Sequence, residues 1–201
     1  AAEAQDNNAL QSFNSDGYVV SSDGTTNAAG TYVSWNWKAG GTAVSNTNGS
    51  ITSQVSANPA AGFSIVSWTH GSGSQSIGHG LSQKPDMIIV KGRSNVSSWW
   101  TWHKGLSSET QSFIHVNTTS AAGANVNAWN NQAPTASVFY QKEYILSNND
   151  TGIAYCFHSV DGHSKVGSFI GNGSETAGPF VHCGFKPAFL LFRRSTETGS
   201  W

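Results

Sequence analysis

The sequence predicts an all-β protein: an antiparallel β-sandwich, concanavalin-like or jelly-roll-like, built from an internal tandem repeat. Three observations indicate this fold class. Apolar runs of strand length recur with turn signals about every 8–12 residues. No long segment has helical periodicity, and two parts of the chain carry the same motifs in the same order.

The composition limits the classes of partner. Charged residues make up only 10% of the 201 residues and nearly balance, with 10 Lys and Arg against 11 Asp and Glu. Nucleic acids and anionic membranes are bound through concentrated positive charge, so we expect neither as a partner. No stretch approaches the roughly 18 apolar residues of a membrane span. Aromatic strands combined with Ser-, Thr-, Asn- and Gly-rich turns are typical of extracellular or virion proteins.

The expected strands can be placed in chain order. GYVV at 17–20 and TYVSWNWKA at 31–39 come first, separated by a turn-rich loop. Residues 41–61 form a linker or an inserted hairpin with Asn48-Gly49 as a turn. The later strands are expected at FSIVSW, DMIIVK, SWWTWH, SFIHVN, NVNAWN, SVFYQ, EYILS, GIAYCFHS, KVGSF, PFVHCGF and AFLLFRR.

The repeat relates residues 62–103 to residues 162–201. Both copies begin with a glycine, contain Gly-x-Gly-Ser, and then contain Lys-Pro, at 84–85 and 186–187. An apolar run follows each Lys-Pro and leads to a basic residue. These shared features are turn and core parts, so the repeat indicates a common fold and no chemistry.

A second internal match defines the unit boundaries. VSWNW at 33–37 aligns with IAYCF at 153–157, and in both segments aromatic residues two positions apart share one face of a strand. Residues 62–160 are therefore expected to be a complete β-sandwich unit. Residues 1–40 are the tail part of a repeat unit and residues 161–201 the head part of a second one. Either these two parts pack together, or the chain is a fragment whose neighbours are missing.

The candidate ligand-binding residues form an aromatic set. They are Trp100, Trp102, His103 and Trp129. Exposed indole rings provide flat apolar platforms for sugar rings, so this set is a candidate glycan site. The alternative is that the tryptophans pack inside the sandwich; that alternative is favoured for the first two, and the two readings are balanced for Trp129 in the polar loop NAWNNQAP.

No motif indicates catalysis, a metal or a cofactor. A glycosidase needs two carboxylates that flank a glycosidic bond, and the acidic residues form no cluster on a predicted strand. Asp86 follows Lys-Pro in a turn, where an aspartate usually accepts hydrogen bonds from backbone donors. The seven histidines lack metal-ligand spacing. Cys156 and Cys183 lie in apolar segments and are expected to be buried free thiols, with a disulfide between them as the alternative.

Several segments in fixed order support a family resemblance. They are YVSWNWKAGGTAVSNTNGSITSQVSANPAAGFSIVSW, GHGLSQKPDMIIVK, WTWHKGL, NNQAPTASVF, IAYCF and GSFIGNGSETAGPFVHCGFKPAFLLFRRS. In them the chain, from about Ser15 to Trp201, resembles a domain of unknown function that recurs in structural and tail-fibre-like proteins of marine tailed phages. The resemblance implies all-β sandwich modules within longer chains and supplies no known catalytic residues.

Together, these observations predict a virion structural or tail-fibre-type module that is not an enzyme and is located on the virion or outside the cell. Its expected partners are other virion or filament subunits, further copies of itself in a homo-oligomer, and cell-surface glycans. Two alternatives stay open: a purely architectural filament or capsid-surface subunit, and a glycan-degrading β-sandwich enzyme.

Overall fold

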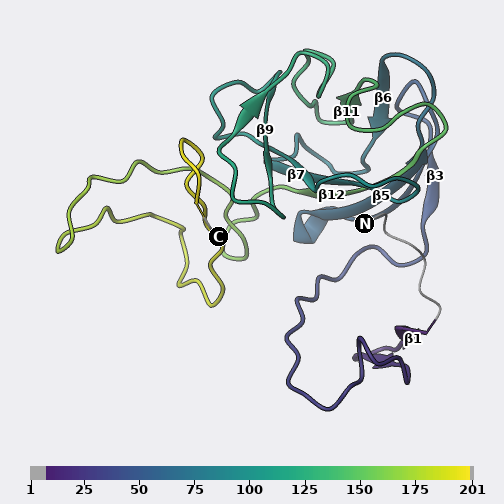
Figure 1. Cartoon of the computed structure of the whole chain (residues 1–201), viewed down its shortest axis with the longest axis horizontal. Helices are drawn as coiled ribbons and strands as arrows, with labels where there is room; N and C mark the ends of the chain where they lie inside the picture. The colour runs from purple at the N-terminus through teal and green to yellow at the C-terminus, as the bar shows by residue number, and fades with distance from the viewer. Residues whose placement is uncertain (1–7, 200–201) are drawn as a thin grey trace.

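A large antiparallel sheet of eight strands organises the computed structural model, which describes residues 8–199 (Figure 1). In spatial order its strands are β10 (Gly123–Ala124), β9 (Ser112–His115), β8 (Trp100–His103), β7 (Met87–Gly92), β12 (Thr151–Phe157), β5 (Phe63–Thr69), β4 (Ser53–Asn58) and β3 (Val44–Asn46). The all-β antiparallel fold class is confirmed. Among the described residues, no helix is long and apolar enough to cross a membrane.

Strand β12 holds the middle of this sheet between β5 and β7. Ala154 lies opposite Val66 on β5 and Val90 on β7, and all three side chains are fully buried. Along β12 buried and half-buried residues alternate, as the two-residue period of a strand requires. The small residues Gly152, Ala154 and Cys156 occupy the buried positions, which leaves room for larger side chains on the neighbouring strands.

A two-stranded sheet forms a second layer over the large sheet, which gives a sandwich-like arrangement (Figure 1). Strands β6 (Gln75–Gly78) and β11 (Val138–Gln141) pair antiparallel. Ile77 and Phe139 are fully buried, and the Phe139 and Trp68 rings form an edge-to-face pair with 5.5 Å between centroids. The hydrophobic core therefore lies between the two layers.

The hairpin between residues 41 and 61 belongs to the large sheet. Strands β3 and β4 pair antiparallel, and β4 pairs with β5. A single 3-10 turn, η1 (Pro59–Ala61), connects β4 to β5 and ends at Gly62, whose φ of 68° suits glycine. At the carboxy-terminal end of this region, an isolated β-bridge between Val160 and Ser164 follows β12. We call residues 44–164 the central unit.

Two segments leave the central unit on different sides (Figure 1). The amino-terminal arm, residues 8–43, contains the short hairpin of β1 (Leu10–Phe13) and β2 (Tyr18–Val20). The carboxy-terminal arm, residues 165–199, contains no strand. Large apolar side chains are exposed along both arms, so the arms have little core of their own.

The structure corrects several strand predictions. Residues of TYVSWNWKA, KVGSF, PFVHCGF and AFLLFRR are not in strands, and neither are those of NVNAWN and EYILS. In the central unit β5 and β7 are joined through β12 between them. The matching segments of the arms have no such partner strand among the described residues, and an isolated strand leaves its backbone hydrogen bonds unmade.

Candidate functional site

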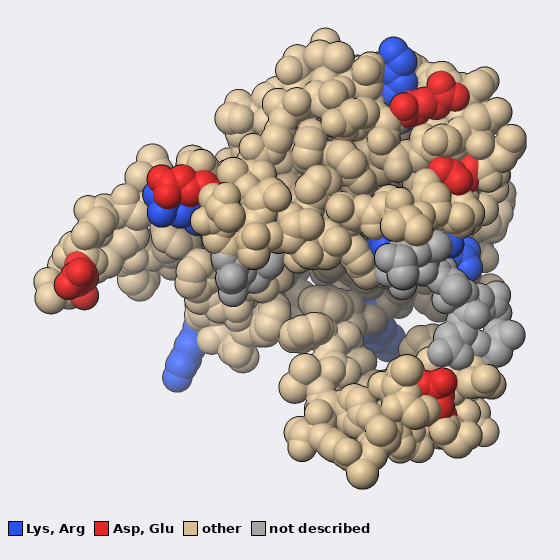
Figure 2. Space-filling view, viewed as in Figure 1, with Lys and Arg blue, Asp and Glu red and all other residues tan. Residues whose placement is uncertain are grey.

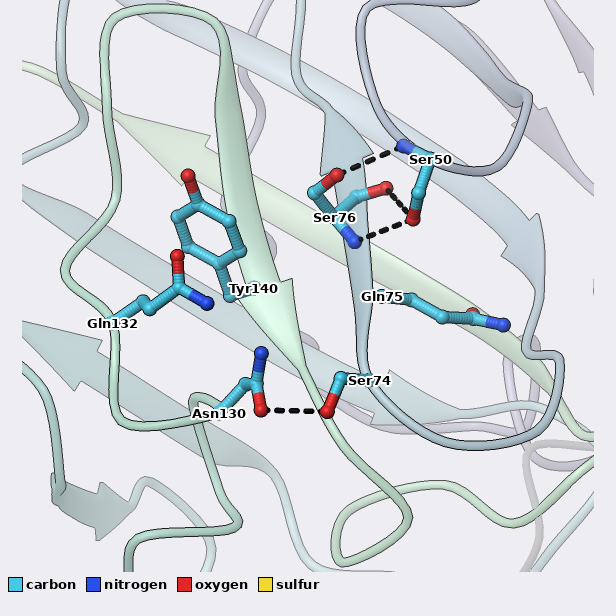
Figure 3. Close-up of a pocket in the computed structure, with 7 residues that line it drawn as sticks. All are labelled: Ser50, Ser74, Gln75, Ser76, Asn130, Gln132 and Tyr140. Atoms are coloured by element: carbon cyan, nitrogen blue, oxygen red, sulfur yellow. Dashed lines mark hydrogen bonds between the residues drawn. The ribbon is translucent and has the colours of Figure 1, made fainter.

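A polar groove lies beside the pair of β6 and β11 (Figure 3). Its lining consists of hydroxyl, amide and phenol side chains: Ser50, Ser74, Gln75, Ser76, Asn130, Gln132 and Tyr140. Reciprocal hydrogen bonds fix one wall, because the Ser50 backbone N–H donates to the Ser76 hydroxyl (2.8 Å) and the Ser76 N–H donates to the Ser50 hydroxyl (2.9 Å). Across the groove, Ser74 Oγ donates to Asn130 Oδ1 at 2.7 Å.

The loop that brings Asn130 and Gln132 to the groove is anchored by Trp129. This indole is 1% exposed and donates from Nε1 to the carbonyl oxygen of Ser112 at 2.9 Å. Asn130 and Asn131 both have φ of 52°, a left-handed conformation that asparagine tolerates better than most residues. A buried aromatic residue and two left-handed asparagines therefore set the position of the polar side chains.

The lining of the groove decides what chemistry it can perform. It contains no carboxylate, imidazole or thiol, so no acidic or imidazole base lies in the lining to activate its serine hydroxyls. Its side chains can donate and accept hydrogen bonds, and Tyr140 adds an aromatic surface beside them (Figure 3). These properties suit reversible binding of a neutral, hydroxyl-rich ligand.

The predicted glycan platform requires correction. Trp102 is 0% exposed and donates from Nε1 to the Glu109 carbonyl at 2.7 Å, and Trp129 is 1% exposed. Neither ring has a face free for a sugar, because both fill the core between the layers. Trp100 is half-buried, with its ring 4.5 Å from that of Phe113 between centroids.

His103, the fourth predicted residue, is also engaged locally. It is half-buried, and its Nδ1 accepts a hydrogen bond from the backbone N–H of Gly105 at 2.9 Å. Burial lowers the pKa of His103, the nearby Lys104 lowers it further, and Asp86 opposes both effects. Neighbouring residues on a strand face opposite sides, so His103 and Trp102 do not share a surface. The four predicted residues thus do not form one site.

Sequence reasoning missed the groove residues because they are ordinary Ser, Asn and Gln residues of turn-rich segments. Tyr140 becomes a neighbour of Ser76 only when β6 pairs with β11, a contact between positions 60 to 66 residues apart. The one available signal was Tyr140 on the predicted strand SVFYQ, an amphipathic ring on a strand next to a polar loop.

The two cysteines were predicted to be buried free thiols. Burial raises the pKa of the Cys156 thiol to about 12, with a hydrogen bond to Ser64 acting the other way, so this thiol stays protonated. Cys183 is partly exposed, and both cysteines are free. Among residues 8–199, no group of three or more His, Cys, Asp or Glu side chains is placed to hold a metal ion.

The arms are a second candidate binding surface, and they are anchored at different places on the sheet. In the amino-terminal arm, Asn58 on β4 donates from Nδ2 to the Lys38 carbonyl at 3.2 Å. In the carboxy-terminal arm, the Ser195 carbonyl accepts from the backbone N–H of Ala122, next to β10, at 2.8 Å. Strands β4 and β10 lie near opposite edges of the eight-stranded sheet.

The exposed apolar side chains of the arms are large. In the amino-terminal arm they include Tyr32, Val33, Trp35 and Trp37, and in the carboxy-terminal arm Phe169, Ile170, Phe180, Phe189, Leu190, Leu191 and Phe192. Ile170 and Phe180 are 91% and 90% exposed. Monomeric soluble proteins rarely expose contiguous apolar patches of more than a few hundred Å².

Comparison with known proteins gives one match. A family model described as a domain of unknown function (DUF7483) matches residues 1–201. No curated protein and no solved structure matches the chain.

Proposed function

The chain belongs to the family of domains of unknown function DUF7483, and from its geometry we propose a structural role in a virion surface assembly of the tail-fibre type. In this proposal the protein is not an enzyme; its central unit is a rigid spacer, and its arms join it to neighbouring subunits. The single observation that carries the proposal is the concentration of exposed apolar side chains on the two arms.

The distribution of these side chains supports the assignment. Within the central unit the exposed large apolar residues are few and scattered: Val44, Val96, Val126 and Tyr144. Burying one Val, Leu, Ile or Phe side chain is worth roughly 1.5–3 kcal/mol, so the arms carry a substantial driving force for association. The central unit carries little of this driving force.

The charge distribution indicates how subunits would associate. Figure 2 shows few charged side chains on the visible face, with both signs interspersed. The whole chain has a formal net charge of −1. Without a strong field of one sign, association depends on apolar contacts and backbone pairing and is expected to change little with salt concentration.

The test is self-association, measured by light scattering across protein concentrations. We expect the wild-type protein to form oligomers and the double variant Phe189→Ser/Leu191→Ser, at two exposed positions of the carboxy-terminal arm, to be monomeric. Val96→Ser is the matched control, because Val96 is 77% exposed but lies on the central unit. A wild-type protein that stays monomeric at the highest soluble concentration would remove the proposal.

A second candidate function, glycan binding, is favoured by the polar groove. Sugars are bound through several hydrogen bonds and an aromatic surface, and the groove supplies both kinds of contact. A glycan array probed with the wild type and with Gln132→Ala tests this function, with the distant exposed variant Gln11→Ala as a control. Signal that is absent, or equal for all three proteins, argues against glycan recognition at the groove.

A further inference from the structure

We propose that residues 31–37 of one copy insert as a central strand between residues 163–169 and 189–194 of a second copy. The inserted strand would complete a second sheet in the register that β12 has with β5 and β7. This inference rests on the proposed assembly role and specifies the contact that produces it.

The central unit provides the template for this contact. Strand β12 pairs antiparallel with β5 through seven residue pairs and with β7 through six. The two outer strands, β5 and β7, do not pair with each other, so β12 supplies the hydrogen-bond partners for one side of each. Residues 161–201 contain counterparts of β5 and β7 but none of β12, so they cannot form this part of the sheet on their own.

The sequence matches place the arm segments in the three positions of the template. Residues 33–37 match 153–157 of β12, residues 163–169 match β5, and residues 189–194 match β7. The match predicts which residues lie opposite each other. Ser34 takes the place of Ala154 and so faces Val166 on one side and Phe192 on the other.

The side chains brought together by this register are compatible. Tyr155 lies opposite Ile89 in the template, and the corresponding arm pair is Trp35 with Leu191. The next pair outward on the same face is Trp37 with Phe189. To form it, the Trp37 ring has to leave Phe63 and Phe157, whose ring centroids lie 6.3 and 5.9 Å from its own. Aromatic residues directly opposite apolar residues are favourable cross-strand pairs. Ser34 between two larger residues repeats the small Ala154 between Val66 and Val90.

Most of the arm backbone is available for this pairing. At the inner end of the carboxy-terminal arm, the Ser164 N–H donates to the Val160 carbonyl and the Val166 N–H to the Ser159 hydroxyl, and pairing would exchange these bonds for ladder bonds. Residues 33–37 and 188–192 make no backbone–backbone hydrogen bond with any other described residue. A strand that adds to a sheet satisfies these groups through the ladder, and its side chains set the register. The predicted strands of the arms therefore form only when the complementary segment arrives.

The positions of the arms indicate a second copy as the partner. The amino-terminal arm is held at β4, and the end of the carboxy-terminal arm is held beside β9 and β10. Strands β4 and β9 are five positions apart in the sheet, roughly 24 Å at about 4.8 Å per strand. One copy thus holds Lys38 and Ser195 near opposite edges of its sheet, which keeps its own residues 31–37 away from its residues 189–194. This arrangement suits a head-to-tail contact between copies, which closes into a ring or continues as a filament.

Engineered disulfides between copies test the contact and its register. In a Cys183→Ser background, one protein carries Ser34→Cys and a second carries Val166→Cys. Residues directly opposite in an antiparallel pair have Cα atoms about 4.5–5.5 Å apart, within disulfide range. After mixing and mild oxidation, we expect a disulfide-linked heterodimer on a non-reducing gel. The matched control replaces Val166→Cys by Ser168→Cys, which is two positions out of register and should link much more weakly.

The outcomes separate this inference from the proposed function. If light scattering shows association but the Ser34 and Val166 variants do not link preferentially, the register is wrong while the assembly role stands. If a chain that carries both Ser34→Cys and Val166→Cys forms only an internal disulfide and runs as a monomer on the gel, the contact lies within one copy and the proposal of a second copy is wrong. If no association occurs, both proposals fail.

Discussion

The carboxylate of Asp86 accepts two hydrogen bonds from Ser159, one from the backbone N–H at 2.7 Å and one from the hydroxyl at 2.6 Å, both at Oδ2. Its other oxygen pairs with Lys104 Nζ at 2.8 Å. Asp86 precedes β7, Ser159 follows β12 and Lys104 follows β8. One carboxylate therefore ties together the ends of three adjacent strands, at the point where the carboxy-terminal arm leaves the central unit.

This arrangement predicts that Asp86→Asn destabilises the fold. Hydrogen bonds to charged groups contribute about 1.5–3 kcal/mol, so we expect the free energy of unfolding to fall by about that amount in urea denaturation. Glu109→Gln is the control, because it breaks the Lys84–Glu109 pair, whose side chains are 40% and 44% exposed. Exposed pairs contribute about 0–1 kcal/mol, and an equal loss in both variants would contradict the special role of Asp86.

The same carboxylate predicts how stability changes in acid. Burial alone would raise the pKa of Asp86, but the hydrogen bonds from Lys104 and Ser159 outweigh it and hold the pKa below its ordinary value of 3.8. In that range the unfolded chain binds the proton more readily than the folded one. The stability contributed by Asp86 is therefore present above pH 3.8 and is lost as the pH falls through the lower folded value. Asp86→Asn should flatten this part of the stability profile.

Protonation of His79 is expected to cause a second loss of stability, at a pH above the range in which Asp86 titrates. Its side chain is fully buried; Nδ1 accepts from the Leu81 N–H at 3.1 Å, and Nε2 lies 3.2 Å from the Thr135 carbonyl. Burial lowers the pKa of His79 from 6.5 to about 4, with the Thr135 carbonyl opposing and His158 adding to the effect. The folded state thus holds the neutral ring, and stability should decline as the pH falls from 6.5 towards 4.

The variant His79→Asn tests this decline. Its Oδ1 can still accept from the Leu81 N–H, but the side chain cannot titrate. We expect a flatter stability profile between pH 6.5 and 4, measured by urea denaturation at several pH values. The exposed His163→Asn is the control and should leave the profile unchanged. A profile that keeps its slope in His79→Asn would assign the effect to another group.

The sequence predicted the parts of the fold that depend on strand periodicity. The alternation in GIAYCF and the apolar run in DMIIVK correspond to β12 and β7, and the hairpin around Asn48-Gly49 corresponds to β3 and β4. Asp86 accepts hydrogen bonds from backbone and hydroxyl donors, as its turn position suggested. These features depend on neighbours in the sequence, and such signals are visible without a structure.

The site could not be predicted in the same way. The polar loop around Trp129 left exposure and burial equally favoured, and in the structure the indole turns inward to donate to Ser112, a residue 17 positions earlier. The strands expected in the arms have the right alternation, yet a strand also needs a partner, and periodicity does not say where the partner is. Long-range pairing, which sequence patterns do not specify, determined both outcomes.

Trp102 and Trp35 both lie in segments that the sequence predicts as strands, but replacing them should change different properties of the protein. Trp102 fills the core, so Trp102→Ala should lower the free energy of unfolding by about 3–5 kcal/mol. Trp35 is 65% exposed on the amino-terminal arm, so Trp35→Ala should leave the unfolding of the central unit nearly unchanged and weaken self-association. Denaturation followed by fluorescence measures the first effect, and light scattering measures the second. A large loss of stability in Trp35→Ala would mean that its ring packs in the subunit itself.

A proline at Ser34 should block assembly without harming the central unit. A middle strand uses its backbone N–H groups in the ladders on both sides, and proline supplies none. An unmade buried hydrogen bond costs about 1–3 kcal/mol, so we expect Ser34→Pro to weaken association by about ten- to hundred-fold. Ala29→Pro is the matched control, since Ala29 lies in the loop before the proposed strand and should associate like the wild type. Equal association of all three proteins would show that residues 31–37 bind as something other than a paired strand.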